Sequence, residues 1–410
     1  MNWAIRTILT ICLLALPLIL YLGLRLAFSF ARLRPGSRRA ARRVVAGVVL
    51  WFCLFPLLVL AENYLGMARN RFELVSAGPL IDYLVVYPFW VALIVAAELT
   101  PVFLLIDLVS IAGRLRPSFR EQWQRKLAMV RVALATAGVL FISVHAFVDT
   151  SHVRDTVVRS RIHNLPRTLE GLRMTVVGDV QVDRYTGGGK IDQLRRIVES
   201  RNPDLLFSPG DVITGGTDYL DAAMSAMCGL KGSVASIAVM GDHDYWSAPD
   251  AIVNRFQDCR WDFLDNEHRI LEYHGSQILV TGLTHIYSQR LNESTLDSIL
   301  SRAPQADLKI LVVHQPARWL VESAARYGYH FVLAGHTHGG QIVLHPLGIP
   351  FTPSMRETPY FTGEYRLGSM SVVVTNGIGL TLAPVRYFAP AEVTTVVLEG
   401  EEEVGGGASD

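Results

Sequence analysis

Four long apolar runs dominate the first 150 residues of the chain. Each contains at least 17 residues with at most one Asp, Glu, Lys, Arg or His. A helix needs about 20 mainly apolar residues to cross a bilayer, so such runs predict membrane-spanning helices. The runs are Thr7–Leu24, Val44–Ala61, Tyr83–Ile106 and Val132–Val148. We therefore predict a transmembrane region over residues 1–150, with spans at about 5–28, 44–62, 81–109 and 128–148.

A cleaved signal peptide is the alternative interpretation of the first run. The apolar region of a signal peptide is about 7–15 residues long. Thr7–Leu24 has 18 residues without a charge, and a second apolar run follows after a short basic loop. We therefore favour an uncleaved first span.

Basic residues are distributed unevenly between the loops that join these runs. The loop 31–43 has six arginines and the loop 112–126 has four arginines and one lysine, whereas the loop 63–79 has two arginines. Basic loops stay in the cytoplasm, so the first and third loops are predicted there and both termini outside. Such loops also bind anionic lipid, which keeps them at the same membrane face. We expect a multi-pass protein of the cell (inner) membrane whose C-terminal domain is extracytoplasmic.

The four cysteines are divided between the two halves of the chain, and no Cys-x-x-Cys motif suggests a thiolate zinc site. Cys12 and Cys53 lie within apolar runs. Cys228 and Cys259 lie in the C-terminal half and can pair if that half is outside, where disulfides persist. Spacing alone does not bring them within bonding distance, so the paired and the free state both stay open.

Residues 169–400 show a different pattern, in which short apolar runs end at a turn with an acidic or imidazole side chain. Amphipathic helix patterns alternate with these runs, for example over 190–200 and 219–230. Such alternation is typical of sheets covered by helices, and the additional runs suggest two sheets packed face to face. We predict an α/β (α+β) domain here, preceded by a connector at 151–168 and followed by a disordered tail at 401–410.

The side chains at the turns are the ligand types of a two-metal site. Ligands that follow strands collect at one edge of a sheet, where open α/β folds place their sites. Two divalent ions held there mostly hydrolyse phosphate esters. Each residue has an ordinary alternative, since a histidine can be a structural residue, an aspartate can cap a helix or form an Asx turn, and a glutamine can bond a neighbouring ligand. The candidate metal ligands are Asp179, Gln181, Asp211, Asp242, His314, His336 and His338.

The order of these motifs over about 172–400 resembles the calcineurin-like metallophosphoesterases. Gly335–Gln341, Asp244-Tyr245-Trp246 and Pro384-Val385-Arg386 are similar to the membrane-associated, YkuE-like branch of that family. The resemblance implies a four-layer αββα sandwich and a binuclear metal centre. With Asp211 as the bridging carboxylate, we expect one metal at Asp179, Gln181, Asp211 and His338, and the other at Asp211, Asp242, His314 and His336.

Two positions depart from the family pattern. Gln181 stands where the first motif usually has His, and Asp242 stands where the third usually has Asn. Both retain an oxygen that can bind metal, and the first change resembles the manganese-dependent ADP-ribose/CDP-alcohol diphosphatases. Because oxygen-rich, anionic sites suit Mn²⁺ or Mg²⁺ better than softer metals, we expect two divalent ions with Mn²⁺ preferred over Zn²⁺ or iron.

Two further side chains are candidates for a role in the reaction. His243 follows Asp242 without being counted as a ligand, and it is the candidate catalytic residue that protonates the leaving group. Arg386 can bind the substrate phosphate through its planar fork, although a surface salt bridge is an equal alternative. The segment 345–360, rich in Pro and aromatic residues, is a lid, a membrane-contacting loop or an ordinary surface loop.

Charged residues also lie inside the predicted spans. Glu98 and Asp107 are in the third span, and Arg131 is in the fourth. Because charges in lipid are costly, we expect Arg131 to pair with one of the two acids. We favour stabilisation of the helix bundle over transport, since the sequence shows no other polar pathway.

The whole pattern predicts a membrane-anchored, binuclear-metal-dependent phosphohydrolase of the phosphodiesterase or pyrophosphatase type. Its partners would be the lipid bilayer and a phosphorylated small molecule or lipid, such as a lipid-linked or envelope substrate. No nucleic acid is expected and no protein partner is identifiable. The alternatives are a non-catalytic metal-binding sensor or scaffold with a degenerate phosphoesterase fold, and a transporter with a regulatory domain. His243 argues against the first, and the few polar groups in the spans argue against the second.

Overall fold

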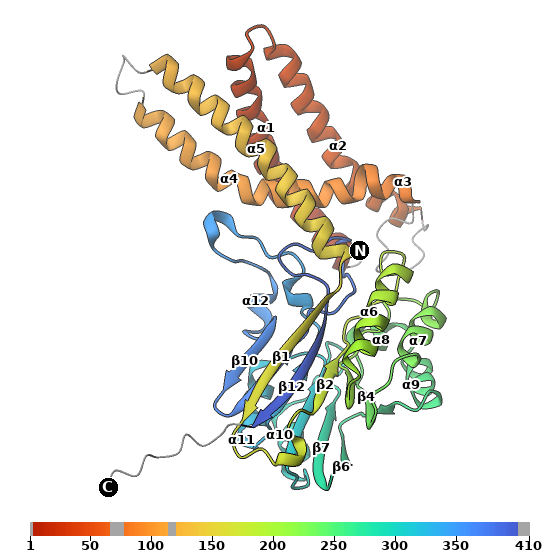
Figure 1. Cartoon of the computed structure of the whole chain (residues 1–410). Helices are drawn as coiled ribbons and strands as arrows, with labels where there is room; N and C mark the ends of the chain where they lie inside the picture. Colours follow the sequence, from red (N-terminus) through yellow and green to blue (C-terminus); the bar gives the residue numbers. More distant parts are fainter. Residues whose placement is uncertain (1–2, 66–77, 114–119, 401–410) are drawn as a thin grey trace, which may run out of the picture. The chain divides into compact units, whose positions relative to one another are not determined.

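The computed structural model of the chain describes residues 3–65, 78–113 and 120–400 (Figure 1). The chain divides into two compact units. The first unit holds the N-terminal helices together with two segments from the C-terminal half, Ile342–Thr352 and Thr381–Phe388. The second unit holds the rest of the described chain from Ser151 onward. We expected both C-terminal segments within the 169–400 domain, but their contacts join them to the helices.

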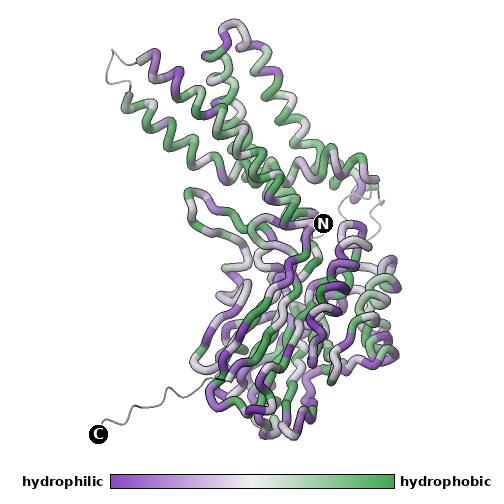
Figure 2. The backbone as a smooth tube through the Cα atoms, in the orientation of Figure 1, coloured by the Kyte–Doolittle hydropathy of each residue, from purple (hydrophilic) through white to green (hydrophobic). Residues whose placement is uncertain are grey.

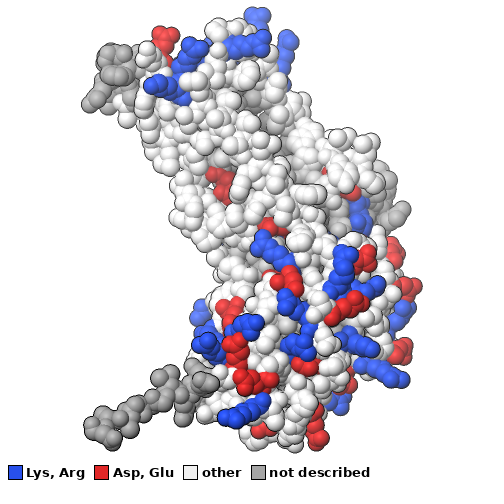
Figure 3. Space-filling model, viewed as in Figure 1, with Lys and Arg blue, Asp and Glu red and all other residues white. Residues whose placement is uncertain are grey.

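Four helices of the first unit are long and apolar enough to cross a membrane. Figure 2 shows hydrophobic residues along all of them, and Figure 3 shows Lys and Arg side chains gathered at the end where the first helix joins the second. The helices are α1 (Trp3–Leu33), α2 (Arg38–Tyr64), a continuous helix made of α3 (Pro79–Ile81), η1 (Asp82–Val86) and α4 (Tyr87–Gly113), and α5 (Arg120–Ser151). All four expected spans lie in these helices, so the chain is membrane-associated.

Aromatic packing and ion pairs hold the helices of the first unit together. Phe89 on α4 stacks on Phe52 of α2, with ring centroids 4.8 Å apart. Asp107 on α4 forms ion pairs with Arg131 of α5 at 2.5 Å and with Arg25 of α1 at 2.6 Å. The expected pairing of Arg131 with an acid of the third span is therefore confirmed, and the pair joins two spans.

The first of two six-stranded sheets in the second unit has the order β1-β12-β2-β3-β4-β5. Strands β1 and β12 are parallel to each other and antiparallel to the other four. The strands are β1 (Arg154–Ile162), β2 (Arg173–Val176), β3 (Leu205–Ser208), β4 (Ala235–Ala238), β5 (Asp262–Phe263) and β12 (Glu392–Gly400). The parallel strands β2, β3 and β4 end at the same edge of the sheet, which places the loops that follow them together.

The second sheet has the order β10-β11-β9-β8-β7-β6. Its four inner strands are parallel, and the edge strands β10 and β6 are antiparallel to their neighbours. The strands are β6 (Glu267–Tyr273), β7 (Ser276–Leu283), β8 (Leu308–Val313), β9 (Phe331–Ala334), β10 (Gly363–Leu367) and β11 (Met370–Val374). The loops after β8 and β9 therefore also share one edge.

The two sheets pack face to face between two layers of helices. Their inner faces share one core, in which Phe207 of β3 and Ile237 of β4 pack with Ile310 of β8. Helices α6 (Gly188–Arg201), α7 (Leu220–Cys228) and α9 (Pro249–Asp258) cover the first sheet, and α10 (Glu293–Ser301) and α11 (Arg318–Arg326) cover the second. The expected four-layer αββα sandwich is confirmed.

The segment 151–168, which we expected to be a connector, contains strand β1. This strand pairs with β12 at the edge of the first sheet. Arg159 and Arg161 are exposed, whereas Ser160 and Ile162 between and after them are buried. An edge strand with charged residues on its outer face lacks the continuous apolar run of a central strand, which explains the wrong expectation. The expected tail at 401–410 lies outside the described residues.

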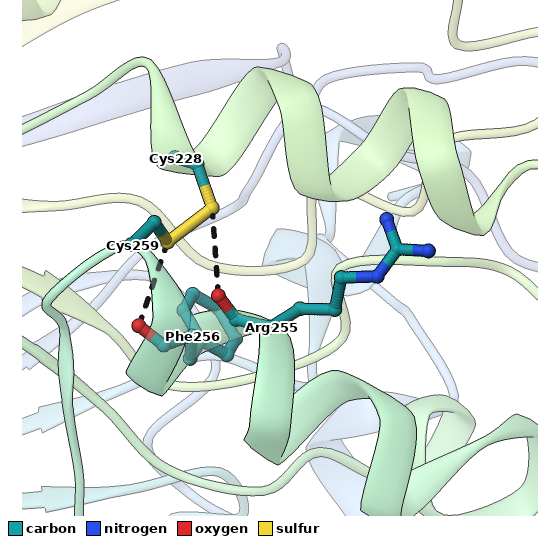
Figure 4. Close-up of a disulfide and its surroundings, with 4 residues drawn as sticks. All are labelled: Cys228, Arg255, Phe256 and Cys259. Carbon is teal, nitrogen blue, oxygen red and sulfur yellow. Dashed lines mark hydrogen bonds between the residues drawn. A yellow bond between two sulfur atoms is a disulfide. The ribbon is translucent and has the colours of Figure 1, made fainter.

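A disulfide joins Cys228 at the end of α7 to Cys259 just after α9 (Figure 4). The two Cα atoms are 5.5 Å apart, within the range that disulfides require. The pairing that the sequence left open is therefore present in the structure, and it ties together two of the helices that cover the first sheet.

Candidate metal centre

The predicted ligands lie in loops that follow five strands of the two sheets. Strands β2, β3 and β4 belong to the first sheet and β8 and β9 to the second. Asp179 and Gln181 follow β2, Asp211 follows β3, Asp242 begins the short helix α8 (Asp242–Ser247) after β4, His314 follows β8, and His336 and His338 follow β9. The candidate site is thus built where the carboxyl ends of strands from both sheets meet.

The backbone of these loops is unusual because five predicted ligands have positive φ angles. Non-glycine residues seldom adopt this conformation, and where it occurs the surrounding structure often holds a functional side chain in place. The angles are 47° at Asp179, 42° at Gln181, 61° at Asp211, 71° at His336 and 52° at His338.

Two glycines allow the ligand loops to approach one another. A Cβ atom at Gly335 would collide with the carboxylate of Asp179, and one at Gly210 would collide with the backbone of Gly241. Gly210 also has a φ of 101°, which favours glycine. Close approach between loops therefore requires glycine at both positions.

The first ligand cluster consists of Asp242, His314 and His336. His336 Nδ1 lies 3.1 Å from Asp242 Oδ2, His314 Nε2 lies 3.4 Å from the same oxygen, and the two ring nitrogens are 3.3 Å apart. Ligands bonded to one ion at about 2.0–2.2 Å are separated by roughly 3.0–3.5 Å in tetrahedral or octahedral geometry. These three atoms therefore fit the coordination shell of a single divalent ion.

The second cluster consists of Asp179, Asp211 and His314. His314 Nε2 lies 3.3 Å from Asp211 Oδ2. His338 Nε2 lies 3.6 Å from Asp179 Oδ1, and the side-chain nitrogen of Gln181 lies 3.3 Å from Asp211 Oδ2. The structure thus brings all seven predicted ligands together, with His338 and Gln181 beside the second cluster. Their binding of metal stays a prediction.

The arrangement adds two details to the expected ligand sets. We expected His314 at one metal only, but its Nε2 lies between Asp211 and Asp242 and so belongs to both clusters. Gln181 has its amide nitrogen toward Asp211. Rotating this amide by half a turn exchanges nitrogen for oxygen without moving the rest of the side chain, which would give a metal an oxygen ligand.

Burial and the crowding of charge set the protonation of the clusters. Burial raises the pKa of Asp179 to about 7. Burial also acts to raise the pKa of Asp242, but hydrogen bonds from His314 and His336 outweigh it and hold the pKa below its usual range. Burial acts to lower the pKa of His336, but hydrogen bonds to Asp242 and Glu357 raise it to about 9. Protons shared between the carboxylates and imidazoles therefore hold the two clusters together. Binding of divalent ions would displace these protons.

His243 is buried beside the second cluster. Its backbone N–H donates to Asp211 Oδ1 at 2.8 Å, and its ring Nδ1 lies 2.5 Å from the carbonyl oxygen of Thr214. Because a carbonyl only accepts, the proton of the neutral ring is assigned to Nδ1, which leaves Nε2 as the ring nitrogen that would exchange a proton with a leaving group. This geometry suits the predicted acid–base role, which stays a prediction.

Three residues that the sequence analysis did not select position the first cluster. Gln315 Nε2 donates to Asp242 Oδ2 at 2.6 Å, and the backbone N–H of Tyr287 donates to Asp242 Oδ1 at 2.7 Å. Glu357 accepts hydrogen bonds from His336 Nε2 at 3.0 Å and from the Tyr287 hydroxyl at 2.7 Å. Gln315 could have been suspected because it follows His314, but neither Tyr287 nor Glu357 stands near a ligand motif.

Arg386 lies in the first unit, in the segment Thr381–Phe388. Its side chain is fully buried, and its backbone N–H donates to Thr150 Oγ1 at 2.8 Å. Burial rules out the alternative of a surface salt bridge. A role in binding substrate phosphate stays a prediction.

The family comparison bears on the part of the chain that contains the clusters. Residues 172–340 match the family model described as calcineurin-like phosphoesterase. This part of the chain belongs to the calcineurin-like phosphoesterase family. All seven candidate ligands and His243 lie within the matched range. The resemblance seen in the motifs is confirmed, and we call the second unit the phosphoesterase domain.

Two curated relatives bear on the two parts of the chain: one is named as a transmembrane protein with this domain, and the other is YkuE itself. A "transmembrane protein with metallophosphoesterase domain" from Danio rerio is 26% identical over 283 residues, which cover 66% of this chain and 63% of that protein. The "uncharacterized metallophosphoesterase YkuE" from Bacillus subtilis is 25% identical over 263 residues, which cover 63% and 88%. The chain thus spans just under two thirds of the length of the vertebrate relative. Among solved structures, a dimetal phosphatase from Danio rerio has a TM-score of 0.34 and 14% identity, over 51% of this chain and 88% of that one.

Proposed function

We propose that the chain is a membrane-anchored hydrolase that cleaves phosphate diesters or diphosphates with the help of two divalent ions. The observation that carries this proposal is the convergence of carboxylates and imidazoles from separate loops, with ring nitrogens 3.1 to 3.4 Å from carboxylate oxygens. Two divalent ions bound there would supply an activated water and the positive charge that a phosphate needs. Asp179, Asp211 and Asp242 would hold the ions, and His243 would give a proton to the leaving group.

We propose Mn²⁺ as the preferred metal. The support is the composition of the clusters, in which Asp242 supplies a carboxylate and Gln181 an amide where a neutral Asn and an imidazole are usual in the family. Three buried carboxylates around two ions favour hard, oxygen-preferring cations. Mg²⁺ would be the next choice, followed by iron and Zn²⁺.

We propose that the phosphoesterase domain lies on the extracytoplasmic side of a cell (inner) membrane and acts on a lipid-linked or envelope substrate. The basic loops of the helical unit support this orientation through the positive-inside rule. The Cys228–Cys259 disulfide supports it independently, because disulfides persist in oxidising compartments and are rare in the cytosol. A membrane anchor favours substrates that are themselves held at the bilayer.

A metal-binding sensor or scaffold is the second candidate. The two departures from the family pattern are its only support. The observation against it is His243, because its Nδ1 is fixed by the Thr214 carbonyl and the ring keeps the tautomer that an acid–base residue needs. A domain without catalysis has no physical requirement for that arrangement.

Hydrolysis of bis(p-nitrophenyl) phosphate by the full chain in detergent tests the proposal. After treatment with a chelator, we expect activity to return with Mn²⁺. Asp211→Ala should abolish it, whereas Asp192→Ala, on the exposed face of α6, serves as the matched control and should retain it. If the protein binds Mn²⁺ but cleaves no phosphomonoester, diester or diphosphate, the sensor function would replace the hydrolase.

A further inference from the structure

A cavity of 590 Å³ adjoins the first ligand cluster. This volume lies within the range of about 300–1,000 Å³ that is typical of small-molecule sites. His336, Gln315 and Glu357 line it on the side of the cluster, and Arg290, Arg318 and Trp319 are among the residues that complete it. Because His336 is a candidate ligand, a phosphate held at the cluster can extend directly into the cavity.

Arg290 and Arg318 are exposed cations at this cavity. Within the part of the chain that the structure describes, neither forms a salt bridge; Arg290 instead lies over the Tyr287 ring, with 5.3 Å between the guanidinium carbon and the ring centroid. A guanidinium offers a planar fork of N–H donors that matches two oxygens of a phosphate. Both arginines can therefore turn toward an anion without breaking an ion pair.

Two carboxylates and one further imidazole also line the cavity. Glu357 accepts hydrogen bonds from His336 and Tyr287. Glu293 lies in the first turn of α10, where the helix dipole stabilises a negative charge. Burial lowers the pKa of His285 to about 4, so this imidazole is neutral near pH 7. Beyond the paired Glu357, the two arginines together outweigh the single carboxylate of Glu293, so positive charge remains for a ligand.

We propose that this leaving-group cavity, defined by Arg290, Arg318 and Trp319 beside His336, selects substrates whose leaving group carries a second phosphate. The substrates would be diphosphate diesters, and the inference rests on the proposed hydrolase function. Water adds to the phosphorus at the ligand clusters and gives up a proton. The bond from that phosphorus to the bridging oxygen breaks with its electron pair on that oxygen, the released phosphate takes up the proton, and two phosphomonoesters leave. The arginines hold the departing phosphomonoester, and the Trp319 ring offers an apolar face to its organic group.

Comparing two substrates tests the cavity in the full chain. Diadenosine diphosphate has a phosphorylated leaving group, whereas bis(p-nitrophenyl) phosphate has an uncharged aromatic ester group. For Arg290→Ala and Arg318→Ala we expect kcat/KM for the diphosphate to fall about tenfold or more, mainly through KM, because a charge-assisted hydrogen bond is lost. The diester should change less than threefold. Arg318→Lys should recover part of the loss, and Arg302→Ala, at the other end of α10, is the control.

The outcomes separate this inference from the proposed function. If both substrates lose activity equally, or neither changes, the cavity does not select a second phosphate although the hydrolase stands. If the wild-type chain cleaves neither substrate, the hydrolase proposal fails. Equilibrium binding of ADP to the chelator-treated protein then still tests whether the cavity binds a phosphorylated ligand. Binding that is about tenfold weaker in the Arg290→Ala/Arg318→Ala double variant would support the anion site, and unchanged binding would overturn it.

A second inference comes from the segment Ile342–Thr352 of the helical unit. Leu344 and Phe351 exchange two backbone hydrogen bonds of 2.9 and 2.8 Å, so the segment folds back as a short loop. At its tip, Leu347 is 56% and Ile349 68% exposed. Two exposed branched side chains at one tip form an apolar patch, which suits contact with lipid on a unit that has membrane-length helices.

The loop is fixed to the spanning helices of its own unit. The backbone N–H of His345 donates to the Glu98 carboxylate on α4 at 2.5 Å. The Phe388 ring lies 4.4 Å from the His345 ring and 4.2 Å from the His145 ring on α5, measured between centroids. Glu98 and His145 both lie within membrane-length helices. The backbone N–H groups of His345, Gly348 and Ile349 all donate to acceptors within the unit, so these three donors do not oppose contact of the loop with lipid.

We infer that the tip of this loop inserts into the lipid bilayer beside α4. Ile349→Cys, in a background with Cys12→Ser and Cys53→Ser, can carry an environment-sensitive fluorophore in proteoliposomes that contain nitroxide lipids. We expect its emission to be quenched as strongly as that of Leu57→Cys, a 58% exposed position on α2, and more than that of Ile270→Cys on β6. Emission like that of Ile270→Cys, with quenching by aqueous iodide, would overturn the inference.

Discussion

Among the candidate ligands, Asp242 should have the largest effect on the preference for Mn²⁺ over Zn²⁺. Its carboxylate approaches both His314 and His336, and it has an acid where the family pattern has an amide. Asp242→Asn removes one negative charge from the first cluster, so we expect the ratio of Mn²⁺- to Zn²⁺-supported activity to fall about tenfold. Activity after chelation and reconstitution with each metal measures this ratio. An unchanged ratio, equal to that of the Asp192→Asn control, would show that the carboxylate does not set the metal preference.

His336 makes metal binding depend on pH. Its pKa is raised to about 9 in the absence of metal, so at pH 7 the ring is protonated, whereas a metal ligand must be neutral. Binding of Mn²⁺ must therefore release protons, and the apparent affinity should rise with pH until about pH 9. Calorimetric titrations in two buffers with different ionisation enthalpies count the protons. Identical heats in both buffers would contradict the prediction, and His336→Ala should release fewer protons than the wild type.

Glu357 should act on the metal through His336 without being a ligand in the predicted sets. It accepts the hydrogen bond of His336 Nε2, which leaves Nδ1 directed at Asp242. Removing such a partner typically lowers metal affinity about 10–100-fold, so we expect this loss in Glu357→Ala and a smaller one in Glu357→Gln, which keeps an acceptor. Metal titration with a competing chelator measures the affinity. Glu199→Ala, on the surface of α6, is the control, and an equal affinity in all variants would exclude the positioning role.

At the residue scale, the sequence predicted side chains that have a local signal and missed those that do not. Asp211 and His336 were found because each follows a glycine at the end of an apolar run. Glu357 and Tyr287 reach the cluster from segments without such a pattern, and only the tertiary fold brings them there. Asp244 accepts the backbone N–H groups of Asp211 and Val212 at 2.7 and 2.8 Å. It therefore fixes a ligand loop.

At the scale of elements, apolar runs of the central strands were visible in the sequence because both faces of these strands are buried. Strand β1 was missed because it lies at an edge and alternates charged with buried residues. The segments Ile342–Thr352 and Thr381–Phe388 were assigned to the wrong unit because their partners, such as Glu98 and Thr150, are more than 200 residues away in the chain. Contacts of this range leave no periodicity in a single sequence.

The disulfide between α7 and α9 gives a prediction about the stability of the phosphoesterase domain. It closes a loop between residues 31 positions apart. Constraint of the unfolded chain by such a loop contributes about 2–4 kcal/mol, so Cys228→Ser should lower the free energy of unfolding by that amount. Denaturant unfolding of the purified chain, followed by tryptophan fluorescence, measures the change. Cys53→Ser is the control, and equal stability of both variants and the oxidised wild type would show that the bond contributes nothing.

At the scale of the whole molecule, the side of the membrane decides which substrates the phosphoesterase domain can meet. In the orientation that we propose, four spans with basic first and third connecting loops would leave the C-terminus outside the cytoplasm. An alkaline-phosphatase reporter, which folds only when exported, should therefore be active when fused after residue 400 of the full chain. Fused within 112–126, after three spans, it should be inactive.

The same topology makes a chemical prediction that does not depend on a fusion protein. In cells, Cys228 and Cys259 should resist alkylation until a reductant that does not cross membranes is added, since an extracytoplasmic disulfide is both formed and accessible. A cytoplasmic domain would instead show both thiols free without reductant. That result, together with an inactive reporter after residue 400, would show that the phosphoesterase domain faces the cytoplasm. The site could then reach soluble cytoplasmic diphosphates and not envelope compounds.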